Sequence, residues 1–465
     1  SEDAPPCGRG ILTLDISYLC LMNLKTFKHG IHPLYCKELT ARKGIERAPI
    51  PKTVTVPLQQ HLGTPCQPLV KKGDVVEEGQ KIGDVVTFVT APVHSPISGK
   101  VKDIERYPYP VGGKVLSVVI EGNEEVKEWP ENNTGLDMDL ITPQSIRDAV
   151  REAGIVGMGG AAFPTHVKLS PPKDKKIDTV IMNGCECEPF LTSDHSLMLE
   201  FPERVLWGMK AIMKAVNAQK GYIGIEENKL DAINIIKEVV RDISPEIEVV
   251  PLETKYPQGA EKMLIKATLN RDVPVGRLPF DVGVVVNNVG TAAAIYDALK
   301  FKKPLIERIV TVSGNGLTEP KNLILRIGTS FKEAIENCGG MTADGERVVI
   351  NGGPMMGVAQ TDLDVPVIKA TSGITVLTGD EIKPEIYHPC IKCAGCVEAC
   401  PVNLMPYRLG DLARLSRVDE FKRWGGLSCV ECGCCSFVCP ARRPLVQWIR
   451  VGKVKVREED KPGSA

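Results

Sequence analysis

The chain has 465 residues, and its 57 basic and 58 acidic side chains give a formal net charge of −1. The hydrophobic fraction of 43% and the charged fraction of 25% are typical of a globular protein. Without an excess of positive charge, and with only 5% aromatic residues, the composition argues against a nucleic-acid partner.

The N-terminal stretch shows no pattern that links it to a folded core, and we interpret residues 1–21 as a leader or an artefact. Its apolar run, 11–22, is 12 residues long and contains Asp15. A membrane-spanning helix needs about 20 residues, and the stretch lacks the basic segment and cleavage site of a signal peptide. We therefore expect a chain that neither spans a membrane nor is exported, and whose thiols are reduced.

Residues 22–135 are predicted to form an N-terminal barrel-sandwich hybrid domain. Short β-rich runs over 53–121 alternate with turns, and "GDVVEEGQKIG" followed by "SPISGKV" resembles lipoyl and biotinyl domains. Those domains carry a modified lysine at a hairpin tip, where this sequence has Phe88. Because no swinging arm can be attached there, we interpret the domain as structural.

Residues 136–304 alternate helices with strands and predict an α/β domain with a largely parallel sheet covered on both faces. Its first helix starts at the N-cap Thr142 and ends at Gly154. We expect strands over 177–183, 221–227 and 282–288, and one long amphipathic helix over 194–217.

Three loops of this domain have the chemistry of a ligand site, because ligands of α/β sheets bind beyond the carboxyl ends of the strands. The first, 157–168, is rich in glycine, so its backbone can approach a phosphate closely. The second, 183–190, contains Glu186 and Glu188, and the third, 287–291, offers two amides and a hydroxyl. Together they predict a nucleotide site. We expect Cys185 and Cys187 to be packing or loop thiols.

Residues 305–382 lose the alternation and show short β-runs around one helix, which predicts a small α+β domain of β-grasp type. The fold class is thus a multidomain α/β protein.

Residues 383–450 repeat one cysteine spacing, C-x2-C-x2-C-x3-C-P, at 390–401 and again at 429–440. In two-cluster ferredoxins the fourth cysteine of each run binds the other run's cluster. The pattern therefore predicts a ferredoxin-type domain with two [4Fe–4S] clusters. The ligands of cluster 1 would be Cys390, Cys393, Cys396 and Cys439, and those of cluster 2 would be Cys429, Cys432, Cys435 and Cys400.

A pair of zinc sites is the alternative, but zinc favours two pairs of ligands rather than three closely spaced cysteines and a fourth before proline. Cys434 breaks the spacing and is interpreted as a bystander thiol. The segment between the runs has a helical pattern and predicts a helical insert. We expect residues 451–465 to be a flexible tail.

The order "GMGGAAFPTHVK", "NGCECEP", "GYIGIEE", "VVNNVGT" resembles the flavin-bearing, NADH-oxidising subunit of respiratory complex I. A closer resemblance, over 22–450, is to the C subunits of Rnf complexes, which add the hybrid domain and the phrases "YPQGAEKMLI" and "GRLPFDVG". Non-covalent FMN would then be surrounded by Gly157, Gly159, Gly160, Lys168, Asn183, Asn287, Asn288 and Thr291. NADH would contact Phe163, Glu186, Glu188 and Glu227. Cys185 departs from the complex I pattern, which has an aspartate there.

The resemblance implies electron transfer between NAD(H), FMN and two clusters, as part of ferredoxin:NAD+ oxidoreduction coupled to ion translocation. The implied partners are other Rnf subunits, including membrane subunits and a ferredoxin-like one, with the chain held peripherally on the cytoplasmic side of the inner membrane. Two alternatives remain: a soluble flavin/iron–sulfur dehydrogenase subunit of cobalamin reductase or hydrogenase diaphorase type, and a non-catalytic electron-wiring scaffold.

Overall fold

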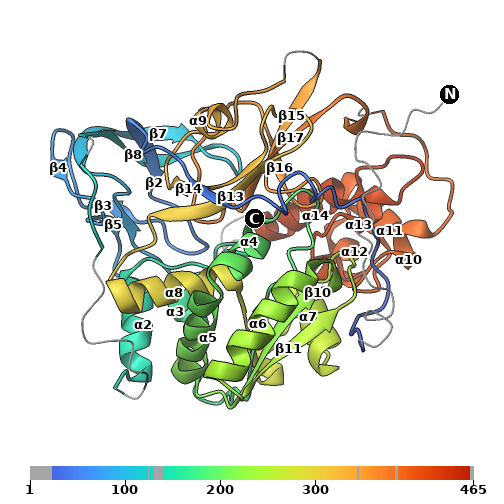
Figure 1. The fold of residues 1–465 in the computed structure, drawn as a ribbon. Helices are drawn as coiled ribbons and strands as arrows, with labels where there is room; N and C mark the ends of the chain where they lie inside the picture. Colours follow the sequence, from blue (N-terminus) through green and yellow to red (C-terminus); the bar gives the residue numbers. More distant parts are fainter. Residues whose placement is uncertain are drawn as a thin grey trace.

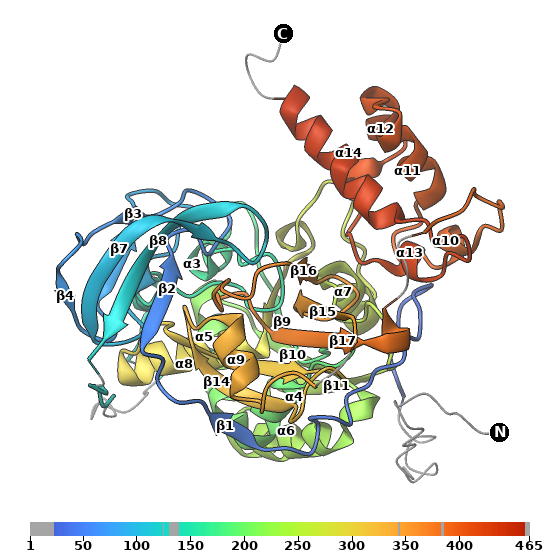
Figure 2. The same ribbon diagram turned by 90° about the horizontal axis from the view of Figure 1, so that it is seen from above.

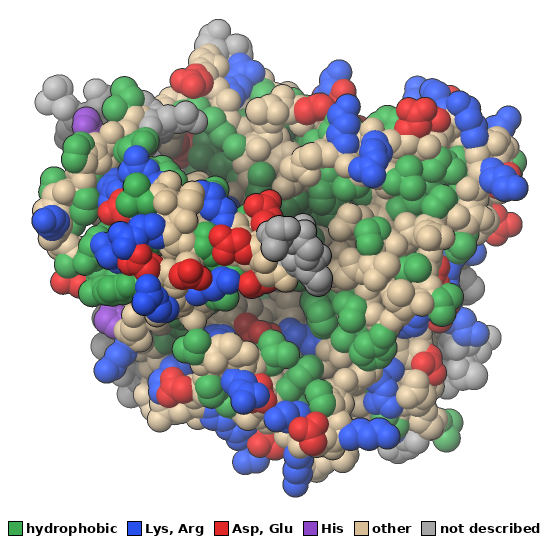
Figure 3. All heavy atoms as spheres, turned by 180° about the vertical axis from the view of Figure 1, so that it is seen from behind, with side chains coloured by type: hydrophobic (Ala, Val, Ile, Leu, Met, Phe, Trp, Pro, Cys, Tyr) green, Lys and Arg blue, Asp and Glu red, His purple; other side chains and the backbone are tan. Residues whose placement is uncertain are grey.

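The computed structural model describes residues 23–123, 125–129, 138, 140–342, 345–382 and 386–460; the expected leader and residues 461–465 of the expected tail lie outside them. The expectation of a flexible tail from residue 451 is wrong over 451–459, which continue the C-terminal helix α14 (Leu445–Glu459). Figures 1 and 2 show a four-part molecule in which the N-terminal hybrid domain and the C-terminal helices lie at opposite ends. The α/β domain and a mixed β-domain lie between them. No helix in these ranges is both long and apolar enough to cross a membrane. From behind, basic and acidic side chains are interspersed (Figure 3), as expected for a net charge near zero.

The hybrid domain consists of two small antiparallel sheets around one apolar core. The first has the order β2 (Thr53–Pro57), β8 (Lys114–Gly122), β7 (Gly99–Pro108), β4 (Val75–Val76). The second has the order β3 (Gln67–Pro68), β5 (Lys81–Asp84), β6 (Val93–His94).

The α/β domain has the predicted parallel sheet, with the order β11 (Ile247–Leu252), β10 (Lys220–Glu226), β9 (Thr179–Asn183), β12 (Val284–Asn288). The first predicted helix is α2 (Pro143–Glu152), and Thr142 and Ser145 form a capping box at its start. The other helical elements are α3 (Thr165–Lys168), η1 (Glu227–Lys229), α6 (Leu230–Ile243), α7 (Glu261–Leu269), η2 (Pro279–Val282) and α8 (Val289–Phe301).

The single helix expected over 194–217 is wrong, because the structure divides it into α4 (Ser193–Glu200) and α5 (Pro202–Val216). Pro202 lacks an amide hydrogen and occupies the first turn of α5, so the helical ladder cannot run through it.

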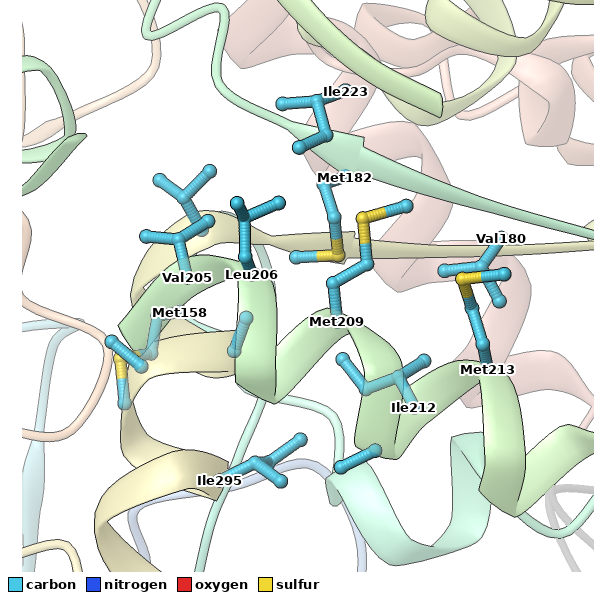
Figure 4. Packing of buried hydrophobic residues seen from close by; sticks show 14 of the residues in the cluster. Met158, Val180, Met182, Val205, Leu206, Met209, Ile212, Met213, Ile223 and Ile295 are labelled. Atoms are coloured by element: carbon cyan, nitrogen blue, oxygen red, sulfur yellow. The ribbon is translucent and has the colours of Figure 1, made fainter. Parts of the chain in front are cut away.

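Helix α5 packs between the sheet and α8. Met209 and Met213 on α5 lie against Met182 of β9 and Ile223 of β10 (Figure 4). Gly208 faces α8 so closely that an added Cβ would lie 1.9 Å from the carbonyl oxygen of Ala292. Gly208 thus permits the close crossing of α5 and α8, the helix that directly follows β12.

The third domain is a mixed sheet with the order β1 (Ile45–Arg47), β14 (Lys321–Arg326), β13 (Glu307–Ser313), β17 (Gly373–Thr378), β15 (Arg347–Asn351), β16 (Val358–Gln360), covered by α9 (Phe331–Glu336) and followed by η3 (Gly379–Glu381). Strand β1 belongs to the region predicted as hybrid domain, yet it pairs with β14. The segment before it pairs with the α/β domain, through Lys25 with Leu252 and Ile31 with Tyr256. Residues 23–47 therefore run along the two central domains.

The C-terminal helical unit, residues 386–460, contains α10 (Gly395–Glu398), α11 (Pro406–Arg414), α12 (Val418–Arg423), η4 (Gly426–Ser428), α13 (Cys434–Phe437) and α14 (Leu445–Glu459). Each cysteine run has one short helix, α10 or α13. The predicted helical insert is present as α11 and α12, which pack on α14 around Phe421 and Ile449.

Three buried histidines lie where the hybrid domain meets the α/β domain: His61, His94 and His166. The Nδ1 atom of each has no hydrogen-bond partner within the described residues. Burial, together with the charge of Lys369, lowers the pKa of His61 to about 4 and that of His94 to about 3. Burial therefore favours the neutral form of the three imidazoles at this junction.

We predict that His94 makes folding acid-sensitive. Its folded pKa lies below the ordinary 6.5, so the unfolded chain binds more protons between these values and stability falls as pH falls. Replacing His94 by Gln should remove about 1.4 kcal/mol of this acid sensitivity per pH unit below 6.5. Urea unfolding of the unmodified chain, His94→Gln and the exposed control His388→Gln, between pH 7 and 5, measures this. Equal pH dependence in all three would contradict it.

Candidate functional site

The candidate site lies at the carboxyl ends of β9, β10 and β12. Asn183 ends β9 and is paired in register with Asn288, the last residue of β12. Gly224, near the end of β10, flanks Asn183 on the other side. Because neighbouring parallel strands end at one edge of the sheet, residues predicted from separate sequence segments are brought together here.

The glycine-rich loop closes over this edge. The amide of Gly157 donates to the carbonyl of Phe163 at 2.9 Å, and the amide of Met158 donates to Thr291 Oγ1 at 3.0 Å. Gly159 packs on Asn288, since an added Cβ would lie 3.1 Å from that side chain. A Cβ on Gly160 would meet no described atom within 4 Å, so the loop is open to a ligand at this residue.

Polar contacts fix two further residues assigned to FMN, Lys168 and Asn288. Lys168 Nζ donates to Glu261 Oε1 at 2.8 Å and to the carbonyl of Val286 at 2.6 Å. Asn288 Nδ2 donates to Asp194 Oδ2 at 2.6 Å. Burial, together with the nearby charge of Glu186, raises the pKa of Asp194 to about 7.

Several buried polar atoms near this edge have no hydrogen-bond partner within the described residues. Within the described residues, Asn287 Nδ2, Glu226 Oε1 and both amide atoms of Gln258 make no hydrogen bond, although these residues are at most 4% exposed. Leaving such groups unpaired costs roughly 1–3 kcal/mol each. A flavin ring offers both donors and acceptors along its pyrimidine edge, so these residues fit FMN. Gln258 was not assigned from the sequence.

Glu186 has a structural role in the described chain. Its Oε1 accepts from the amide of Asp194 at 2.8 Å and from Ser193 Oγ at 3.1 Å, and its Oε2 accepts from the amide of His195 at 3.1 Å. The carboxylate thus caps the N-terminus of α4, where a negative charge is favourable.

Glu188 also uses both carboxylate oxygens within the chain. Oε1 accepts from the amide of Met356 at 2.8 Å and Oε2 from the amide of Met355 at 3.1 Å, in the loop between β15 and β16. Burial raises the pKa of Glu188 to about 7, although both amide bonds oppose that shift. Its assigned contact with NADH stays a prediction.

Phe163 and Glu227, the other residues assigned to NADH, lie at the same end of the sheet. Phe163 follows the open part of the glycine-rich loop and is 36% exposed. Glu227 follows β10, and its Oε1 accepts from the amide of Thr254 at 3.3 Å. An exposed ring can stack on a dinucleotide base without prior rearrangement of the core.

Lys37, which the sequence did not single out, holds the loop that follows β9. Its Nζ donates to the carbonyl oxygens of Glu186 at 2.8 Å, Glu188 at 3.0 Å and Leu191 at 2.5 Å. Burial lowers the pKa of this ammonium group, and the charge of Glu186 opposes that shift.

The cysteine spacing predicts two sets of ligands in the C-terminal helical unit. Burial raises the pKa of Cys396, and negative charge on Cys439, Cys390 and Cys393 raises it further, so these four thiols lie near one another. No group of three or more His, Cys, Asp or Glu in the described ranges is arranged for a single metal ion. A [4Fe–4S] cluster instead needs thiolates around a larger inorganic core.

The second set lies deeper. Burial raises the pKa of Cys429 to about 11, with further contributions from Cys432 and Cys400. Burial raises the pKa of Cys435, and negative charge on Cys429, Cys432 and Cys400, and on Cys396 of the first run, raises it further. These four cysteines border a small cavity whose walls include Pro401, Leu404, Pro406, Val446 and Ile449.

Family models match three parts of the chain: a Nuo51 FMN-binding domain over residues 150–297, an RnfC barrel sandwich hybrid domain over 25–125, and an SLBB domain over 309–359. Among solved structures, an NAD+-reducing [NiFe]-hydrogenase in the H2-reduced state is 17% identical with a TM-score of 0.47, covering 68% of this chain and 61% of that chain.

Curated relatives are similar over nearly the whole chain. In Clostridium ljungdahlii, the C subunit of a proton-translocating ferredoxin:NAD(+) oxidoreductase complex is 48% identical, covering 93% of this chain and 94% of its own length. The Na(+)-translocating counterpart from Acetobacterium woodii is 45% identical, covering 95% and 100%. The C subunit of an ion-translocating oxidoreductase complex from Rhodobacter capsulatus is 39% identical, covering 93% and 83%. The chain therefore belongs to the family of C subunits of ion-translocating ferredoxin:NAD(+) oxidoreductase complexes, the Rnf complexes.

Proposed function

We propose that this chain passes electrons between NAD(H) and iron–sulfur clusters, as the peripheral C subunit of an ion-translocating ferredoxin:NAD+ oxidoreductase. The observation that carries the proposal is the edge of the parallel sheet, where unpaired buried amides of Asn287 and Gln258 lie in the same domain as an open glycine-rich loop. Full-length relatives that are named subunits of such complexes support it.

FMN, when bound, converts the two-electron chemistry of a hydride into the single-electron steps that clusters accept. In this proposal the backbone at Gly159 and Gly160 holds its phosphate, with Lys168 as a nearby cation, while Gly157 and the Thr291 hydroxyl fix the loop through their bonds to Phe163 and Met158. Asn183, Asn287 and Asn288 bind and orient the ring system. The unpaired donor of Asn287 supports this orientation.

For the dinucleotide, we propose that Phe163 stacks on a base and that Glu227 accepts hydrogen bonds from ribose or amide groups. Glu186 and Glu188 already accept bonds from backbone amides. Their contribution in this proposal is to hold the loop after β9 in the shape that the nucleotide meets.

We propose a two-cluster, ferredoxin-type fold for residues 386–460. The nearness of Cys439 to the first run, and of Cys400 to the second, supports ligands that cross between the runs. The proposed partners are the other Rnf subunits, including membrane subunits and a ferredoxin-like one, on the cytoplasmic side of the membrane.

The first prediction concerns the glycine-rich loop. Gly160 has no positive φ and open space at its Cβ position, so Gly160→Val should fold without an internal clash. Its side chain would occupy the space proposed for FMN, and the purified variant should lose its FMN while keeping its iron. Flavin fluorescence after denaturation and iron analysis measure both quantities.

The control for this experiment is Gly44→Val, an exposed glycine at which an added Cβ would make only an ordinary contact, 3.8 Å from Glu200 Oε1. It should retain FMN. A Gly160→Val variant with a full complement of FMN would place the flavin elsewhere. An unmodified chain that holds iron but no FMN would favour the alternative of a non-catalytic electron-wiring scaffold.

The second prediction concerns the crossing ligands. Replacing Cys400 by Ala should damage the cluster of Cys429, Cys432 and Cys435, and leave the cluster beside it in sequence intact. Low-temperature EPR should then lose one of two cluster signals, and iron content should fall by about half. Cys338→Ala, a buried thiol in the third domain, is the control and should lose nothing. Selective loss of the other cluster would refute the crossing.

A further inference from the structure

The loop between β11 and α7 connects the two halves of the molecule. At one end, Gly259 approaches Asn183, whose Nδ2 donates to the Gly259 carbonyl at 2.8 Å. At the other end, three residues earlier, Tyr256 is fully buried and is the largest of the fully buried side chains. Its ring packs with Ile31, Ala399, Cys432 and Cys434, which belong to the N-terminal segment and the C-terminal helical unit.

The Tyr256 hydroxyl bonds to the backbone of the second cysteine run. It donates to the carbonyl oxygen of Cys432 at 2.7 Å, and Glu188 Oε1 lies 3.4 Å from the same hydroxyl. The backbone of Tyr256 is held as well, since its amide and carbonyl both pair with Ile31. A buried phenol on a fixed backbone thus touches the loop that carries Cys432.

The third domain supports the same loop. Glu188 accepts the amides of Met355 and Met356, and the carbonyl of Met355 lies so near Gly433 that an added Cβ would be 2.7 Å away. Gly433 has φ +83, which a side chain would also oppose. The residue after Cys432 is therefore packed against the loop that binds Glu188, and the Cys432 carbonyl faces Tyr256.

The first part of the first cysteine run is more exposed, although Ala399 near its end packs with Tyr256. Residues 386–394, which include Cys390 and Cys393, are exposed, whereas Cys432 and Cys435 are buried. The two proposed clusters thus differ in position: the second faces the α/β domain and the first faces outward.

We propose that Tyr256 is a positioning residue that fixes the Cys432 loop, and with it the cluster of the second cysteine run, beside the flavin site. This inference rests on the proposed function, because it assumes a cluster on Cys429, Cys432, Cys435 and Cys400. The hydroxyl dipole points its positive end toward the Cys432 carbonyl. A positive end near a cluster favours the more negative, reduced form, so the hydroxyl raises the reduction potential of this cluster relative to a chain that lacks it.

The test is Tyr256→Phe in the full chain, which removes only the hydroxyl. Redox titration followed by EPR should show one cluster signal shifted to lower potential and the other unchanged. The shifted signal should be the one that Cys400→Ala abolishes. Tyr109→Phe, at a half-buried tyrosine of the hybrid domain, is the control and should shift neither signal.

Selective loss of iron from the second-run cluster of Tyr256→Phe, in a folded chain, would also support the positioning role. Unchanged potentials of both clusters, or an equal shift of both, would overturn it. An unmodified chain without any cluster signal would refute the proposed function itself, which separates the two failures.

Discussion

A buried ammonium group is stable only when oxygen atoms accept its hydrogen bonds. At Lys37 this constraint fixes the loop at the centre of the molecule. Its ammonium group bonds to three carbonyls of the loop after β9. Removing such a partner would leave buried groups unsatisfied, so the loop and the N-terminal segment hold each other in place. The fixed loop then orients Glu186 onto α4 and Glu188 toward Met355, Met356 and Tyr256. The Lys37 ammonium group therefore supports the chain of contacts that leads from the sheet edge, through Glu188 and Tyr256, to the second cysteine run.

The hybrid domain contributes to the same site without a modified lysine. The Leu62 amide donates to the carbonyl of Ala162 in the glycine-rich loop, and the imidazole of His166 on α3 lies 2.9 Å from the carbonyl of Phe88. Lys369, from the third domain, donates to carbonyls of Pro92 and Gly154 and so joins three domains. Phe88, where a lipoyl or biotinyl domain would carry its arm, instead packs against α3. The hybrid domain thus supports the glycine-rich loop and the helix that follows it.

Sequence patterns predicted those features that depend on residues close together in the sequence. The cap at Thr142, the parallel strands and the cysteine spacing each depend on neighbouring residues, and the described elements agree with the first two. The prediction of one long helix over 194–217 was wrong because Pro202 interrupts it, although the apolar pattern continues through this proline. The roles of Lys37 and Tyr256 depend on contacts with residues that are 149 and 176 positions away in the sequence. Periodicity in the sequence does not reveal such contacts. The role of Gln258 was missed as well. The pairing of β1 with β14 was missed for the same reason. The ligand sets of the clusters stay predictions.

The central claim is that one chain holds a flavin and two clusters, joined through the Tyr256 loop. Cofactor analysis of the full chain, purified without oxygen, tests it most directly. The account predicts one non-covalent FMN and about eight iron and eight acid-labile sulfide atoms per chain, since each cluster of this type has four of each. A chain with zinc in place of iron, with only about four iron atoms, or without flavin would contradict it.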